Sequence, residues 1–176
     1  MTNITKFYGH HVSKPYHQFS NFYESPFNYT LPQYLQSNDY PPIIICNHSE
    51  KAIMISKAIL MNDKEIFMKL VNTKNPAECK KLGRLIKNFN QQLWDKYIEQ
   101  IAYDVLLQKF TSNSELTDLL LSTNNNIIVE STENDKIWGN GININDPKSN
   151  DPNSWIGKNI LGNALMRVRG TLLNKT

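Results

Sequence analysis

Apolar residues recur at three- and four-residue spacing through the middle of this 176-residue chain, and this period constrains its fold more than any other feature. In residues 91–110, QQLWDKYIEQIAYDVLLQKF, the apolar positions form one stripe along a long helix. The same spacing predicts a helix over roughly residues 50–61, with Ser49 as its N-cap. Pro76 suits the first turn of another helix that reaches about Ile86. We expect these helices to build the core.

The rest of the chain adds few strands. The first 45 residues are rich in aromatic residues, Pro and Asn, which favours short strands and ordered loops. IIVES at 127–131 is typical of a short buried strand, Ser114 begins the helical pattern of ELTDLLLS, and a last helix is predicted over about 161–173. No repeat or linker divides the chain. We therefore predict a mainly α protein: a single compact helical domain over residues 1–176, with a few short strands near the N-terminus and at about 127–131.

Composition excludes several classes of protein. Hydrophobic residues make up 40% of the chain and charged residues 20%, close to the average of globular proteins that fold without metal or disulfide staples. The formal charge of +3 assists an anionic substrate but falls short of a strongly basic nucleic-acid-binding surface. Cys46 and Cys79 are expected to be two buried thiols rather than a bridge.

No metal, cofactor or membrane contact is expected. The four histidines lack the spacing of a helical zinc pair, and the Asp- and Asn-rich DPKSNDPNS does not fit a calcium loop. The N-terminus lacks the pattern of a secretory leader, and no apolar run approaches the roughly 18 residues of a membrane span. We expect an intracellular, cytoplasmic, soluble protein without an obligate protein partner.

Glu50 and Lys57 are the first candidates for chemistry. Seven residues apart on a helix, they point within about 20° of each other and lie about 10 Å apart along the axis. One interpretation is a carboxylate and an ammonium that bracket a ribose, as in glycoside cleavage. The other is an ordinary solvated face, although the apolar Met54 between them argues against full exposure of that face to solvent.

A second set of candidates lies in ESTENDKIWGNG. Glu130 ends the predicted strand, and Asp135, Trp138 and Gly139 follow in a turn-rich loop. A Trp beside Gly can lie flat against a nucleobase, and Asp135 can accept a hydrogen bond from a ribose hydroxyl or a base amine. The alternative is a hydrophobic plug with an Asx turn. Trp94 has a similar alternative, because it fits the apolar stripe of its helix.

A third set could hold phosphate. WIGKN precedes the last predicted helix, and Lys158, Arg167 and Arg169 lie near this Gly-containing loop and the helix start. The glycine and lysine spacing matches neither a Walker nor a dinucleotide-binding motif.

Taken in order, the motifs resemble the NADAR family, also called YbiA-like. They are FSNFYESPF at 19–27, SEKAIMISKA at 49–58, KKLGR at 80–84, LLQKF at 106–110, LLLST followed by IIVESTENDKIWGNG, and WIGKN followed by LG and ALMRVR. The match runs nearly end to end. The resemblance implies a mainly helical protein that cleaves N-glycosidic bonds.

By position, the resemblance implies a set of site residues. Glu50 would be the leading catalytic carboxylate, Lys57 a site residue, and Trp94, Asp135 and Trp138 substrate contacts. Further motif positions are matched by Asn21, Glu130, Gly139, Asn159 and Arg169, which we also expect to contact the substrate. We predict that Asp135 acts with Glu50 and Lys57 in catalysis, that the base stacks on Trp138, Phe19 or Phe22, and that the pyrophosphate meets Lys158 or Arg169. The implied activity is removal of ADP-ribose from guanine, with an ADP-ribosylated guanine nucleoside or nucleic acid as the partner molecule. The alternatives are cleavage of phosphoribosylamino-pyrimidine intermediates of riboflavin synthesis, and a non-catalytic module that binds ADP-ribose.

The chain departs from the family pattern in one motif. Many relatives read SEHYFQAQK, whereas this chain has Lys51, Ala52 and Ser56 in place of His, Tyr and Gln. The Glu and the Lys of the motif remain. Because the riboflavin assignment belongs to relatives with the fuller motif, we favour ADP-ribosyl-guanine as the substrate.

Overall fold

The computed structural model describes residues 3–174 and confirms the predicted mainly α class. This part of the chain contains six α-helices and four β-strands of four residues each. Three strands lie in the first 46 residues, and the fourth, β4 (Ile127–Glu130), lies where a buried strand was predicted. Four short 3-10 helices complete the regular structure, at His17–Phe19, Gln33–Leu35, Pro147–Asn150 and Pro152–Ser154.

Two compact units make up the described chain. One contains the residues up to 23 and from 113 onward (unit 1), and the other contains residues 24–112 (unit 2). The prediction of one domain over residues 1–176 stays a prediction, and its first and last two residues lie outside the described part. None of the helices within residues 3–174 combines the length and the hydrophobicity needed to cross a membrane.

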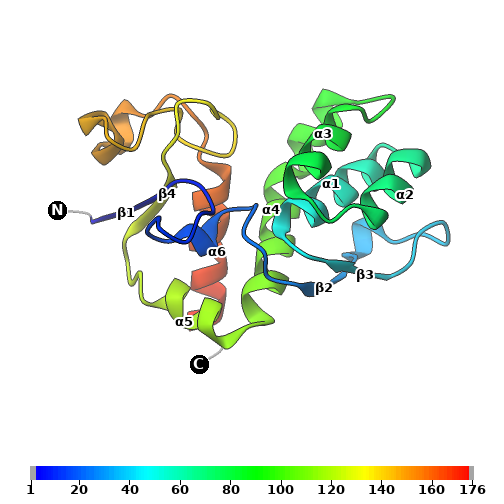
Figure 1. Cartoon of the computed structure of the whole chain (residues 1–176), viewed down its shortest axis with the longest axis horizontal. Coiled ribbons are helices and arrows are strands. Elements are labelled where there is room, and N and C mark those ends of the chain that lie inside the picture. The colour runs from blue at the N-terminus through cyan, green and yellow to red at the C-terminus, as the bar shows by residue number, and fades with distance from the viewer. Residues whose placement is uncertain (1–2, 175–176) are drawn as a thin grey trace. The chain divides into compact units, whose positions relative to one another are not determined.

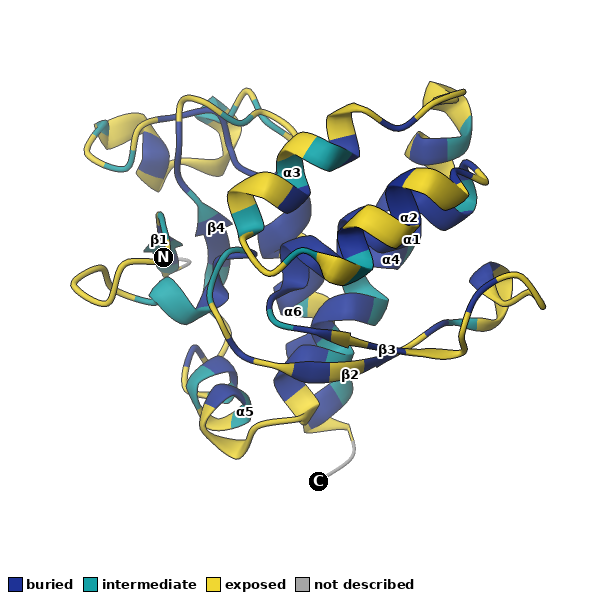
Figure 2. Cartoon of the chain, turned by 45° about the vertical axis from the view of Figure 1, so that its right-hand side comes forward, coloured by how far each residue is buried: buried dark blue, intermediate teal, exposed yellow. Residues whose placement is uncertain are grey.

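Unit 2 is built around its first helix, α1. Its elements are β2 (Phe27–Thr30), β3 (Ile43–Cys46), α1 (Ser49–Leu60), α2 (Lys64–Asn72), α3 (Pro76–Arg84) and α4 (Gln91–Thr111) (Figure 1). Ten of the twelve residues of α1 are buried, because α2, α3 and α4 all pack against it. The strands pair antiparallel with Phe27 opposite Cys46, and β3 alternates exposed and buried residues (Figure 2). A polar side chain on α1 is therefore held in a desolvated environment.

The helix bounds of unit 2 match the sequence pattern except at two points. Ser49 was predicted as the N-cap of α1, but it is the first helical residue and His48 is the cap. The Nδ1 atom of His48 accepts the Lys51 N–H at 3.1 Å, and its Nε2 atom lies 2.8 Å from the Lys74 carbonyl oxygen. The ring thus bonds two segments at once, and burial lowers the pKa of His48, which favours the neutral ring.

Helix α2 was not predicted from the sequence, because residues 62–75 were expected to connect two helices. It has nine residues, and only Ile66, Phe67 and Leu70 are buried. Asp63 fixes its start, since one carboxylate oxygen accepts the Ile66 N–H at 3.0 Å and the other accepts the Lys87 N–H at 2.8 Å. So short an amphipathic segment is stabilised by its cap and its packing more than by its own propensity.

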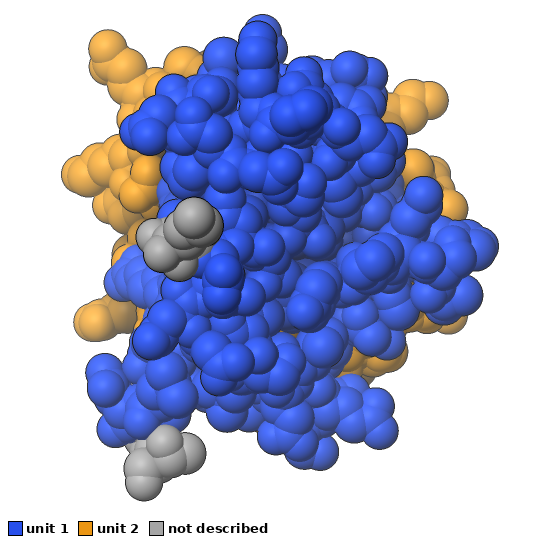
Figure 3. Space-filling view, turned by 90° about the vertical axis from the view of Figure 1, so that its left-hand side faces the viewer, with its two compact units in different colours: residues 1–23, 113–176 blue, residues 24–112 orange. Residues whose placement is uncertain are grey.

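Unit 1 joins the two ends of the chain. Strand β1 (Ile4–Phe7) pairs in parallel with β4, with Ile4 opposite Ile127. Helices α5 (Ser114–Leu121) and α6 (Ile160–Leu173) pack against each other, and α6 also packs on β4. Figure 3 shows the two segments of this unit as one continuous body. The predicted last helix is thus confirmed, and α5 begins at Ser114 as predicted, with Asn113 as its N-cap.

Both cysteines are free and buried, which confirms the prediction of two thiols. Burial raises the pKa of the Cys46 thiol to about 12 and that of Cys79 to about 11. Neither thiol forms a reactive thiolate at neutral pH, and both act as small apolar side chains in the interior of unit 2.

Two glycines of α6 give a matched test of the packing on β4. A Cβ atom at Gly162 would meet the Ile128 carbonyl oxygen and the Asn159 side chain, whereas a Cβ atom at Gly170 would meet nothing within 4 Å. We expect Gly162→Ala to lower the free energy of unfolding by about 1 to 3 kcal/mol through overpacking. Gly170→Ala should raise it by up to about 1 kcal/mol, since Ala is the better helix former. Urea unfolding measures both, and equal stability of the two variants would contradict this account.

Candidate active site

Glu50 lies in the first turn of α1, and its side chain is only 6% exposed. The partial positive charge of the helix N-terminus favours a carboxylate at this position. The neighbouring Ser49 is fully buried, and its hydroxyl has no hydrogen-bond partner within the described part of the chain. Buried polar groups are rarely left in this state, so the start of α1 is a polar position inside a desolvated region. From the sequence pattern, Ser49 was expected only to cap the helix.

Lys57 lies two turns further along the same helix and is half-buried. Its Nζ atom donates to the Gly83 carbonyl oxygen at 3.0 Å. The same atom lies 4.6 Å from the centre of the Phe89 ring and 5.5 Å from the centre of the Trp94 ring, within the range of a cation–π interaction. The structure therefore brings together two predicted residues, Lys57 and Trp94. Phe89 was missed, since it lies between helices and outside any apolar stripe.

A close approach of α3 to α1 creates this environment. Gly83 on α3 has no side chain, and a Cβ atom there would overlap the Met54 side chain on α1. The glycine lets the Met54 side chain pack directly against the α3 backbone, and the Gly83 carbonyl lies within reach of the Lys57 amine. The glycine of KKLGR thus has a structural role, and Met54, between Glu50 and Lys57 in the sequence, is buried against it.

The charges of Glu50 and Lys57 interact. Burial lowers the pKa of Lys57 because desolvation penalises its ammonium form. The negative charge of Glu50 acts in the opposite direction and raises this pKa, and the positive charge of Arg84 lowers it. The helix face therefore carries a buried carboxylate and an amine whose pKa depends on it. Such a pair is typical of sites that transfer protons or stabilise developing charge.

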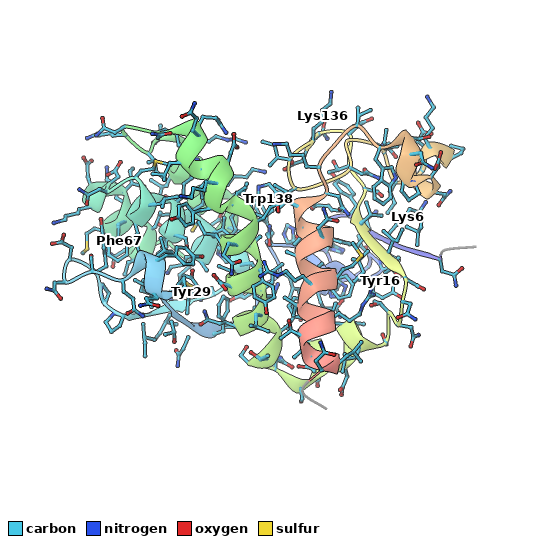
Figure 4. All side chains as sticks on the ribbon, turned by 180° about the vertical axis from the view of Figure 1, so that it is seen from behind. Lys6, Tyr16, Tyr29, Phe67, Lys136 and Trp138 are labelled. Carbon is cyan, nitrogen blue, oxygen red and sulfur yellow. The ribbon has the colours of Figure 1, made fainter. Side chains whose placement is uncertain are left out.

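In unit 1, Asp135 and Trp138 belong to one turn. One Asp135 carboxylate oxygen accepts the Ile137 N–H at 2.9 Å and the Trp138 N–H at 2.8 Å. This is the Asx turn that the sequence analysis held as an alternative, and it fixes the backbone of the half-buried Trp138 (Figure 4).

Gly139 and Asn159 hold this loop on the end of β4. A Cβ atom at Gly139 would lie 2.8 Å from the Glu130 carbonyl oxygen, so only glycine fits. Asn159 is buried in the left-handed conformation, with φ of 50°. Its amide oxygen accepts the Glu130 N–H at 3.2 Å, and its amide nitrogen donates to the Ile128 carbonyl oxygen at 2.9 Å. Both residues shape the loop, with Glu130 held at its base.

The basic candidates differ in what they can reach. Arg169 is buried, and its Nη1 atom donates to the Thr123 hydroxyl at 2.7 Å and to the Asn126 carbonyl oxygen at 2.9 Å. Its guanidinium thus stabilises the turn that precedes β4. Lys158 is exposed, as is Arg167. Of these residues, Lys158 has the freedom to meet a phosphate that Arg169 lacks.

The three N-terminal candidates are also distinct. Phe19 is fully buried and meets the edge of Phe7 at 5.6 Å between ring centres, which is a core contact. Phe22 is half-buried, with the His10 ring 5.6 Å away. Asn21 is buried, and its amide oxygen accepts no hydrogen bond from any residue between 3 and 174. This orphaned oxygen marks Asn21 as a group to which a ligand could donate.

Residues 3–174 contain no cluster of three or more His, Cys, Asp or Glu able to hold a metal ion.

The coupling of Glu50 to Lys57 gives a pH prediction. Because the Glu50 charge favours the ammonium form, Glu50→Gln should lower the pKa of Lys57 below its wild-type value. The pH dependence of Lys57 acetylation, followed by mass spectrometry, should shift its midpoint to lower pH. Glu65→Gln is the control, since Glu65 is exposed and paired with Lys69 and Lys87. An unchanged midpoint in Glu50→Gln would show that the two charges do not interact.

Known proteins resemble this chain over most of its length. An N-glycosidase of Acanthamoeba polyphaga mimivirus is 35% identical over 153 residues, which are 87% of this chain and 86% of that protein. The chloroplastic riboflavin biosynthesis protein PYRR of Zea mays is 27% identical over 176 residues, or 98% of this chain and 26% of that protein. The NMR structure of the E. coli protein YbiA has a TM-score of 0.74 at 27% identity, covering 99% of this chain and 88% of that one.

The NADAR domain family matches residues 6–173, which include every motif on which the resemblance rested. The solved YbiA structure supports the same assignment at the level of the fold. The chain therefore belongs to the NADAR domain family.

Proposed function

We propose that this protein is an N-glycosidase that hydrolyses the bond between ribose and a base, and that its substrate is ADP-ribose attached to guanine, either free or in nucleic acid. One observation carries the proposal: the buried Glu50 carboxylate shares a helix face with a half-buried amine whose pKa is lowered by burial. The name of the viral relative, an N-glycosidase, supports the reaction class.

Glu50 acts at the anomeric carbon in this proposal. When the bond from that carbon to the base nitrogen breaks, its electron pair leaves with the base and positive charge remains on the ribose. A carboxylate near this charge stabilises the transition state, and more strongly in a desolvated region than in water. Water then adds its oxygen to the anomeric carbon, and its proton balances the departing base. Glu50 can also orient this water.

Lys57 contributes through either protonation state. As an ammonium it holds a ribose hydroxyl or a phosphate oxygen, and as a neutral amine it can attack an opened sugar. The lowered pKa makes the neutral form more accessible than on an ordinary surface lysine. Phe89 and Trp94 flank this amine with apolar surface, so both limit its hydration.

The residues of unit 1 enter the proposal in two groups. Trp138, Asp135 and Lys158 are proposed to contact the substrate through stacking, hydrogen bonding and charge. Asn21 joins them because its amide oxygen is unused. Five further predicted residues act through the fold: Gly139, Asn159, Glu130, Arg169 and Phe19 keep the surrounding segments in place. Phe22 stays a proposed contact.

A second candidate is cleavage of a phosphoribosylamino-pyrimidine, which the name of the maize relative favours. The departures from the family motif bear on this choice. The Lys51 Nζ atom donates to the Val71 carbonyl oxygen at 2.8 Å, and the Ser56 hydroxyl lies 2.8 Å from the Tyr29 hydroxyl. Both side chains are buried and serve packing within unit 2. Glu50 and Lys57 could act on a substrate with either leaving group. An enzymatic assay is therefore needed to distinguish the two candidate substrates.

The reaction is tested by Glu50→Gln, which keeps the shape of the side chain and removes its charge. We expect guanine release from ADP-ribosylguanosine to fall at least about 100-fold, the usual scale for loss of an acid–base or charge-stabilising group. Glu99→Gln, an exposed glutamate on α4, is the control and should keep wild-type activity. Wild-type turnover in a folded Glu50→Gln variant would remove Glu50 from the mechanism. Tight binding of ADP-ribose without base release by the wild-type protein would instead identify a non-catalytic reader.

A further inference from the structure

We propose that a cavity in unit 1 binds one nucleotide of a single-stranded nucleic acid. The proposal rests on the function proposed above, since it concerns guanine within a strand. The cavity has a volume of about 160 Å³ and lies at the carboxyl ends of β1 and β4. It is lined by Tyr8, Lys14, Asn143, Ile144, Asn145 and the segment 131–134.

Strand pairing places two of the cavity walls. Phe7 and Glu130 are opposite each other in the parallel pair, and the Ser131 N–H donates to the Phe7 carbonyl oxygen at 2.9 Å. The chain therefore leaves both strands at the same edge, with Tyr8 on one side and residues 131–134 on the other. The Thr132 hydroxyl accepts the Asn134 N–H at 3.2 Å, which holds this second wall in a turn.

The third wall is fixed by a lysine of β1. The Lys6 Nζ atom donates to the Ile144 carbonyl oxygen at 3.0 Å and to the Ser149 hydroxyl at 2.9 Å (Figure 4). Ser149 is fully buried, and its carbonyl oxygen accepts the Trp155 indole N–H at 3.1 Å. Residues 143–145 are thus bonded to β1 and do not form an unsupported loop. The cavity has walls that exist before a ligand binds.

The groups that face the cavity suit a nucleotide. The Lys14 ammonium and the Glu133 carboxylate form no ion pair or hydrogen bond with any described residue, and the side-chain amides of Asn134 and Asn145 likewise bond to none. Lysine meets a phosphate as a point charge, while carboxylate and amide groups can pair with the edge of an unstacked base. The Tyr8 side chain is 43% exposed and offers a ring for stacking.

Size and charge narrow the ligand further. Pockets for drug-sized ligands measure about 300 Å³ or more, so a cavity of about 160 Å³ holds a fragment such as one base or sugar. Residues 1–23 include no Asp or Glu, but they contain two lysines, three of the four histidines and three tyrosines. Cations interleaved with aromatic rings are typical of grooves for single-stranded nucleic acid. The lining itself carries one cation, Lys14, and one anion, Glu133, so Lys14 is the group that would meet a phosphate.

Binding of an unmodified single-stranded DNA tests the cavity without any glycosidase activity. Fluorescence anisotropy with a short labelled oligonucleotide should give salt-dependent binding. Lys14→Ala should reduce the slope of log affinity against log salt by about one, as expected for a lost phosphate contact. Tyr8→Ala should weaken binding on the order of tenfold through lost stacking, and Tyr8→Phe should keep it. Lys148→Ala is the control, since it removes the same charge from an exposed residue that does not line the cavity.

A second readout joins the cavity to catalysis. In Lys14→Ala and Tyr8→Ala, the ratio of kcat/KM for an ADP-ribosylated oligonucleotide to that for ADP-ribosylguanosine should fall about tenfold. If wild-type protein binds no unmodified DNA and both variants keep the wild-type ratio, the cavity is not a nucleotide site. If it binds DNA but releases no guanine from either substrate, the proposed function fails while the cavity proposal stands.

Discussion

The burial of α1 against three other helices determines the chemistry available to unit 2. A solvent-facing helix with Glu and Lys seven residues apart has two hydrated charges of little consequence. Here Met54 packs against Gly83 of α3, and the amine of Lys57 lies near the Gly83 carbonyl oxygen and two aromatic rings. The resulting desolvation perturbs the pKa of Lys57, and Glu50 offsets part of that effect. Packing and reactivity thus have the same origin.

Unit 1 is stabilised differently from unit 2, because its long segment after β4 has no extended regular structure. In this segment, hydrogen bonds from Asn and Asp side chains hold the backbone in place of the backbone–backbone bonds of a sheet. Asp135 closes the turn at Trp138, and Asn159 joins the end of β4 to the start of α6. Lys6 then anchors residues 143–145. A loop built from such side-chain bonds can present polar groups in fixed positions, which is the usual way in which loops carry binding sites.

Much of this organisation was predictable from the residues. Helical spacing located α1, α4 and α6 to within one or two residues, because each has an apolar face long enough to show its period. Helix α3 has only Cys79 and Gly83 buried, and it was located by Pro76 in its first turn. The spacing of Glu50 and Lys57 predicted one face, but it could not distinguish a wet face from a buried one. That difference depends on α2 and on Gly83, neither of which the sequence pattern singled out. The internal partners of Arg169, Thr123 and Asn126, could not be predicted, because they lie more than 40 residues away in the sequence.

We propose that the protein releases a base from ribose and that guanine is the leaving base. To test this, the wild-type protein is incubated in parallel with ADP-ribosylguanosine, with single-stranded DNA that carries ADP-ribosylated guanine, and with a phosphoribosylamino-pyrimidine. The products are quantified by chromatography. We expect ADP-ribose to be released from both guanine substrates, and faster than the pyrimidine is cleaved. Cleavage of the pyrimidine alone, or of none of the three, would contradict this proposal.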